Sequence, residues 1–190
     1  RFDRVTDILN ARRPVPILER FTAGEETVFI AGSSWPADEA VYFPWLKEHP
    51  EVKAIIAPHE YDSERVHRLL DAFPGQTVSW TQAKLSEKAL DGKRVLIMDC
   101  FGLLSAAYRY GDIAYVGGGF GAGIHNINEA AVFGMPVLFG PNHAKFIEAR
   151  DLLNCGGAFA VTSPADFSRL ATPLLEEAPR STAGGASAAY

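Results

Sequence analysis

The sequence predicts a doubly wound α/β domain, in which helices cover both faces of a parallel sheet. Short runs of consecutive apolar residues recur along the chain, as expected of strands that are buried on both faces. Between these runs, apolar residues recur at helical spacing; Val66, Leu69, Leu70 and Phe73, for example, would share one face of a helix. Strands that alternate with amphipathic helices are typical of a Rossmann-like parallel sheet.

Most of the expected strands alternate with expected helices. The first strand, at 27–31, ends at Gly32-Ser33-Ser34, and the second, at 52–57, ends at Pro58-His59. Further strands are expected at 76–80, 94–98, 113–116, 136–139 and 158–161 because each is a short β-prone or apolar run. Helices are expected at 37–48, 62–73, 103–110, 126–133, 144–153 and 164–177. The domain would span 1–178, and residues 179–190, rich in Ala, Gly and Ser, would form a flexible, linker-like tail.

The composition is that of one globular domain. The 190 residues are 47% hydrophobic and 22% charged, which suffices for a substantial core. The net charge of −5 does not indicate a basic surface that would bind nucleic acid. The sequence also has no run of Lys and Arg of the kind that anchors a protein to a membrane. No apolar run approaches the roughly 20 residues of a membrane helix, and no signal-peptide pattern opens the chain. The sequence begins with Arg1-Phe2-Asp3 and has no starting Met. We therefore expect it to be a piece of a longer protein.

The stretch 113–131 carries the strongest functional signal. It combines an expected strand, five glycines within residues 117–123 and an expected helix start. Glycines allow a tight turn and the close approach of a ligand, and the N–H groups of a helix N-terminus favour an anion. We therefore expect a phosphate group to bind here. An alternative interpretation is that Asn126 is only an N-cap and Glu129 only the far half of a capping box.

Nearly all the other unusual residues follow the carboxyl ends of expected strands, where ligands bind on open parallel sheets. These turns are predicted to converge on one nucleotide. The glycine backbone would hold a phosphate, Ser33 and Ser34 would add hydroxyl donors, and Glu129 would accept hydrogen bonds from a ribose diol.

Other kinds of site find little support. Cys100 and Cys155 lie 55 positions apart without ligands at metal spacing, which argues against a zinc site or a disulfide framework. The sequence contains no His-x-x-x-His pair, no Gly-x-Ser-x-Gly elbow, no phosphate-binding P-loop and no Asp-x-Asp pair. No metal and no cofactor are therefore expected.

Several motifs occur in the order and spacing of a known family. They include Val116-Gly117-Gly118-Gly119, His125-Asn126-Ile127-Asn128-Glu129 and the run at 133–141. Further matches are Phe2-Asp3-Arg4-Val5, Gly32-Ser33-Ser34 with Glu39, Pro58-His59, and Asp99-Cys100-Phe101-Gly102 with Tyr108. Together they resemble the C-terminal half of 3-deoxy-D-manno-octulosonic acid (Kdo) transferases. These are GT-B glycosyltransferases, which move Kdo from CMP-Kdo to a lipid A precursor in lipopolysaccharide biosynthesis.

The resemblance implies a donor-binding role for particular residues. Ser33 and Ser34 would lie near the donor phosphate, Pro58 and His59 would border the cytosine, and the backbone around Phe101 and Gly102 would read its edge. The phosphate-binding turn would comprise Gly118, Gly119 and Asn126, with Glu129 on the ribose and Lys145 as a further candidate contact to the donor.

Three departures from the family pattern affect the base and loop contacts. The family commonly has Pro-Arg-His where this chain has Pro58-His59, and Gly-Glu-Leu where it has Gly102-Leu103-Leu104. The proline usual after His-Asn is Ile127. An arginine contact to the nucleotide would therefore be lost or moved.

The resemblance also implies what this chain lacks. In such enzymes the acceptor surface and the catalytic base lie on the N-terminal half, so the catalytic residue is unknown here and the fragment alone is expected to be inactive. The full-length protein would act at the cytoplasmic leaflet of the inner membrane and contact membrane and acceptor through the missing half. Two alternatives remain open: another GT-B enzyme that takes a uridine nucleotide, of the UDP-hexosaminyltransferase or UDP-sugar epimerase type, and a non-catalytic nucleotide-binding domain.

Overall fold

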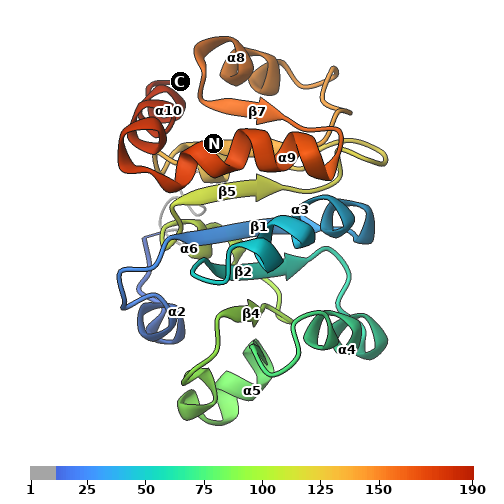
Figure 1. The fold of residues 1–190 in the computed structure, drawn as a ribbon, viewed down its shortest axis with the longest axis vertical. Helices are drawn as coiled ribbons and strands as arrows, with labels where there is room; N and C mark the ends of the chain where they lie inside the picture. Colours follow the sequence, from blue (N-terminus) through green and yellow to red (C-terminus); the bar gives the residue numbers. More distant parts are fainter. Residues whose placement is uncertain (1–11) are drawn as a thin grey trace.

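A computed structural model describes residues 12–190, which form a single parallel sheet flanked by helices (Figure 1). The seven strands lie in the order β3-β4-β2-β1-β5-β6-β7, and neighbouring strands run parallel. Their bounds are β1 Val28–Ser34, β2 Lys53–Pro58, β3 Thr77–Ser79, β4 Val95–Ile97, β5 Ile113–Val116, β6 Val137–Phe139 and β7 Ala158–Ala160. The predicted doubly wound fold and the seven expected strands are confirmed.

Helices cover both faces of this sheet. The α-helices are α2 Pro16–Phe21, α3 Pro36–Glu48, α4 Ser63–Asp71, α5 Trp80–Leu85, α6 Leu104–Tyr108, α7 Asn128–Ala131, α8 Ile147–Cys155, α9 Pro164–Ala171 and α10 Glu177–Ala189. Two 3₁₀ turns, η1 Glu87–Leu90 and η2 Thr172–Leu175, complete the set. Figure 1 shows α3 and α9 in front of the sheet and α6 behind it. Within residues 12–190, no helix is long and apolar enough to cross a bilayer.

The core explains why the strands are continuously apolar. Alternate residues of β1 enter different layers: Phe29 packs with Tyr42, Trp45 and Phe167 on the side of α3 and α9, whereas Ile30 belongs to the cluster on the opposite side. Every residue of β5 and β6 is buried. Both faces of each strand therefore need apolar side chains.

The topology also fixes where a ligand can bind. From β1 the chain moves outward to β2 on one side, and later returns to β5 on the other. The strand order thus reverses between β1 and β5, and this switch point opens a crevice at the carboxyl ends of the two strands.

Some elements differ from the sequence prediction. The expected strand at 76–80 ends one residue early, since Ser79 and Gln82 form a capping box that begins α5. Helix α2 was not predicted. Helix α7 covers only Asn128–Ala131 rather than 126–133, and Gly134 with a φ of 72° ends that turn.

The largest difference concerns residues 179–190, which were expected to be a flexible tail. Residues 179–189 belong to helix α10, in which Ala183, Gly184 and Ser187 are buried. Small side chains let this helix approach closely: a Cβ on Gly184 would lie 2.1 Å from the carbonyl oxygen of Gly134. The low-complexity composition reflects close packing here, and the domain continues to the last helix. The predicted junction motif at 2–5 lies outside the described residues.

Candidate functional site

A cavity of about 390 Å³ opens at the switch point of the sheet. Its wall is built from the ends of β1 and β2, the loop after β4, helix α6 and the segment that leads into α7. The described lining residues are Ser33, Ala57, Pro58, His59, Tyr61, Met98, Cys100, Phe101, Gly102, Leu104, Ser105, Tyr108, His125, Asn126 and Glu129. This is the edge where ligands bind on doubly wound sheets.

Many of the residues expected to bind a nucleotide meet at this cavity. They are Ser33, Pro58, His59, Phe101, Gly102, Asn126 and Glu129. They come from four separate loops or elements, so only the fold brings them together. Their roles toward a ligand stay predictions.

The other expected contacts lie elsewhere. Ser34 is 1% exposed, and its hydroxyl is hydrogen-bonded at 2.6 Å to Glu39 and at 2.7 Å to Tyr42, so it supports the site from beneath. Gly118 and Gly119, within the glycine loop, are buried and are not among the described lining residues. Lys145 is exposed and is also absent from that lining.

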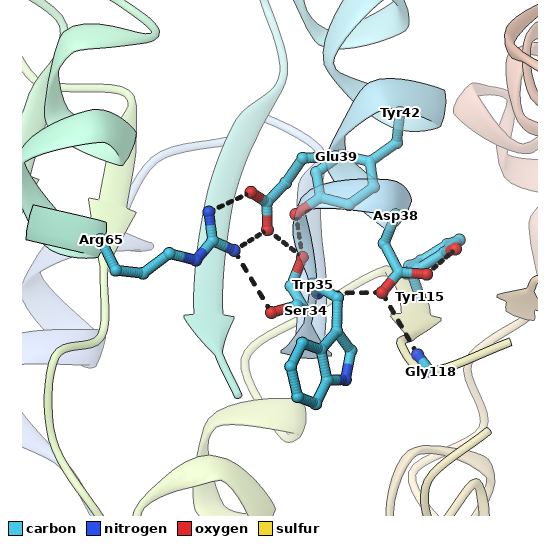
Figure 2. A network of polar contacts seen from close by, with 8 residues as sticks. All are labelled: Ser34, Trp35, Asp38, Glu39, Tyr42, Arg65, Tyr115 and Gly118. Carbon is cyan, nitrogen blue, oxygen red and sulfur yellow. Dashed lines mark hydrogen bonds and ion pairs between the residues drawn. The ribbon is translucent and has the colours of Figure 1, made fainter. Parts of the chain in front are cut away.

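Two adjacent carboxylates at the start of α3 hold these loops in place (Figure 2). The first, Asp38, is 1% exposed. Its Oδ2 accepts hydrogen bonds from the backbone N–H of Trp35 at 2.9 Å and of Gly118 at 3.2 Å, and its Oδ1 accepts from the Tyr115 hydroxyl at 2.6 Å. These donors replace the water that a buried carboxylate loses. Asp38 therefore fastens the glycine loop and β5 to the end of β1.

The second carboxylate, Glu39, joins α3 to α4. The guanidinium of Arg65 donates to both of its oxygens, at 2.6 and 2.5 Å, in the bidentate arrangement visible in Figure 2. The side chain of Arg65 is 13% exposed and that of Glu39 is 5% exposed, so removing one partner would leave a charge buried without compensation. Because the loop that carries His59 runs from β2 to α4, this ion pair also positions one wall of the cavity.

Backbone contacts between the loops that follow β1 and β5 explain why position 117 is a glycine. Ser33 adopts a φ of 50°, in the left-handed region that non-glycine residues rarely occupy. Its carbonyl oxygen would lie 2.1 Å from a Cβ on Gly117. The two loops therefore pack backbone against backbone, and only glycine fits at position 117.

Three planar side chains stack in a column, and two of them, His59 and His125, line the cavity. The rings of Trp35 and His59 stack with centroids 4.4 Å apart, and His59 and His125 stack at 4.7 Å. Burial lowers the pKa of His125, the neighbouring His59 lowers it further, and the Asp38 charge opposes the change. Sequence reasoning did not place His125 in the site, although the residue precedes Asn126 in the motif.

Comparisons with known proteins bear on this site. No family model matches the chain. The chain is 29% identical over 153 residues to the 3-deoxy-D-manno-octulosonic acid transferase of Rickettsia felis, covering 78% of this chain and 32% of the relative. It is 28% identical over 152 residues to the enzyme of the same name from Aquifex aeolicus, covering 77% and 41%. The resemblance to the Kdo transferases is confirmed.

A solved structure extends the match with the Kdo transferases to the fold. The C-terminal CMP-Kdo binding domain of WaaA from Acinetobacter baumannii superposes with a TM-score of 0.76 over 96% of each chain, at 18% identity. The present chain thus has the fold of the C-terminal half of a GT-B enzyme. It spans about a third of the length of the curated Kdo transferases that it matches.

Two ionisable side chains of the cavity wall have raised pKa values. Burial and the Asp99 charge raise the pKa of the Cys100 thiol to about 11, which keeps this group protonated at neutral pH and poorly nucleophilic. Burial and the Glu129 charge raise the pKa of Tyr108. Within residues 12–190, no cluster of three or more His, Cys, Asp and Glu side chains could hold a metal ion. The wall offers hydroxyl, amide, imidazole and carboxylate groups for polar contacts.

Proposed function

We propose that this chain is the donor-binding half of a Kdo transferase, and that CMP-Kdo binds in the cavity at the switch point. The observation that carries the proposal is the convergence of Ser33, Pro58, His59, Asn126 and Glu129 on one cavity from separate loops. The names of the relatives and the CMP-Kdo binding domain with the same fold support it.

Each part of the nucleotide has a complementary group in the cavity. Phe101 is 90% exposed, and its ring offers a flat apolar surface to the cytosine in the cavity that Pro58 and His59 also line. Glu129 accepts hydrogen bonds from the ribose hydroxyls. The side-chain oxygen of Asn126 accepts a hydrogen bond from the Asn128 N–H at 3.0 Å, so its amide nitrogen is the group that donates to a phosphate oxygen.

In this account the chain stabilises the leaving group. Transfer of Kdo to a hydroxyl acceptor needs a base on that hydroxyl and stabilisation of the charge that develops on the departing CMP phosphate. The amide of Asn126 and the hydroxyl of Ser33, both on residues that line the cavity, would serve the second purpose. The base and the lipid A precursor site would belong to the longer protein, which would act on its lipid acceptor at the cytoplasmic side of the inner membrane.

Thermal unfolding of the chain with different nucleotides tests this proposal. At a concentration 100 times its Kd, a ligand that binds only the folded state adds about 2.7 kcal/mol of stability. For a domain of this size that corresponds to a rise in Tm of about 5–11 °C. We expect this rise with CMP and a smaller one with UDP. A larger rise with UDP would favour a uridine-nucleotide enzyme, and no rise with either would contradict the proposal.

A further inference from the structure

We propose that His59 and His125 become protonated when the cavity binds an anion and supply the positive charge that holds it. Anion binding by this chain is then coupled to proton uptake. The identity of the anion, the phosphate of a cytidine nucleotide, rests on the proposed function; the charge argument itself does not.

The first support is the charge of the cavity wall. Among the described lining residues there is no lysine or arginine, and Glu129 contributes a negative charge. Arg65 lies nearby, but its guanidinium is engaged by both oxygens of Glu39. Helix α7 has only four residues, so its terminus adds little positive potential. Of the lining side chains, the two imidazoles are the groups that gain positive charge near neutral pH.

The second support is the geometry of the two histidines. Their rings stack 4.7 Å apart with an interplanar angle of 30°, and both line the cavity. They come from different loops, one after β2 and one after β5, and Trp35 closes the column at 4.4 Å from His59. Because both rings line the same cavity, one anion bound there can accept a hydrogen bond from each.

The third support is the balance of charges around the pair. Burial and the proximity of His59 lower the pKa of His125, which favours the neutral form of that ring. The charge of Asp38, beneath the glycine loop, opposes this. The other ionisable groups of the described cavity wall are Tyr61, Cys100, Tyr108 and Glu129. The carboxylate of Asp99, which precedes Cys100, is hydrogen-bonded to Thr81. A bound anion would offset the repulsion between two protonated rings and shift the balance toward the charged forms.

Histidine NMR measures this protonation directly. We would follow the ring Cε1–H signals from pH 5 to 9 in the free chain, with saturating CMP and with inorganic phosphate, and assign them with His59→Gln and His125→Gln. We expect CMP to raise the titration midpoint of His125 by at least about one pH unit, which corresponds to tenfold tighter binding by the protonated form. His67, on the exposed side of α4, is the internal control, and its midpoint should not move.

Binding affinities give a second readout. The CMP affinity of the wild type relative to that of His125→Gln cancels the titration of the nucleotide's own phosphate. We expect this ratio to be about three- to sixfold larger at pH 6 than at pH 8 when binding raises the midpoint by one unit, and His67→Gln to leave it unchanged.

The possible outcomes separate this inference from the proposed function. If CMP saturates the chain while the titrations of His59 and His125 stay unchanged, the inference is wrong and the donor site stands. If inorganic phosphate raises the His125 midpoint but CMP does not bind, the inference stands and the cytidine assignment fails. If neither ligand changes the spectrum, both are overturned.

Discussion

Removing the Asp38 carboxylate should destabilise the chain strongly, and the size of the effect follows from its hydrogen bonds. In Asp38→Ala, the Tyr115 hydroxyl and the Gly118 N–H lose their partner in buried surroundings. A buried polar group without a partner costs about 1–3 kcal/mol, so the two together give about 4 kcal/mol. The Trp35 N–H is only partly buried, and water can replace its lost bond.

Asp38→Asn should cost much less, because an amide can satisfy most of the same partners. With its oxygen toward Trp35 and Gly118, the amide accepts both backbone hydrogen bonds, and its nitrogen donates to the Tyr115 oxygen. Only the hydroxyl proton of Tyr115 is then left without an acceptor, which costs about 1–2 kcal/mol.

Urea unfolding of the three proteins provides the assay. We expect the free energy of unfolding to decrease in the order wild type, Asp38→Asn, Asp38→Ala. In a parallel thermal unfolding experiment, the Tm should fall by about 2–4 °C for each kcal/mol lost. A control is Glu64→Gln, which removes an exposed ion pair to Arg68 and should change stability by less than about 1 kcal/mol. Equal losses for Asn and Ala, or a loss below about 1 kcal/mol for Ala, would refute the assignment of Asp38 as the group that fastens the glycine loop.

Further predictions concern single positions. Gly117→Ala should cost about 1–3 kcal/mol, since its Cβ would meet the Ser33 backbone, whereas Gly121→Ala, with its nearest atom at 3.9 Å, should be neutral in the same unfolding assay. In α10, Gly184→Ala should destabilise the chain because it would meet the Gly134 carbonyl, but Gly185→Ala, with nothing within 4 Å, should add up to about 1 kcal/mol. The folded-state pKa of His125 is lowered, so its contribution is complete above the unfolded pKa near 6.5 and is lost as pH falls below it. The urea midpoint should therefore fall less between pH 7 and 5 in His125→Gln than in the wild type.

The strands were predictable because they are buried on both faces, which leaves a continuous apolar run in the sequence. The sequence predicted secondary structure less well where tertiary contacts determine it. The polar pair Ser79 and Gln82 begins a helix inside a segment that was expected to be a strand. Residues 181–189 look like a linker by composition, yet their small side chains allow α10 to pack against Gly134.

The site was partly predictable for a similar reason. Residues that follow strand ends meet at the switch point of any doubly wound sheet, so Ser33, His59 and Asn126 could be placed from their positions alone. The hydrogen-bond partners of a side chain could not be predicted from its position after a strand. The hydroxyl of Ser34 is taken by Glu39 and Tyr42, which only the packing of α3 on β1 brings near.

The glycine loop depends on an acid with no sequence signal of its own. Asp38 lies in the first turn of a helix, where acidic residues are common because they favour the helix dipole. Its hydrogen bonds to Tyr115 and Gly118 span 77 and 80 positions. Such contacts follow from the tertiary fold, and no local pattern predicts them.

Calorimetric titration of the chain with CMP and with UMP tests the central claim most directly. The account predicts that CMP binds more tightly than UMP, and that Glu129→Ala weakens CMP binding by at least about tenfold, because a hydrogen bond to a charged group contributes about 1.5–3 kcal/mol. Glu64→Ala, on the exposed surface of α4, should leave the affinity unchanged. Tighter binding of UMP, or CMP binding that is insensitive to Glu129→Ala, would contradict the assignment of this cavity as a cytidine nucleotide site.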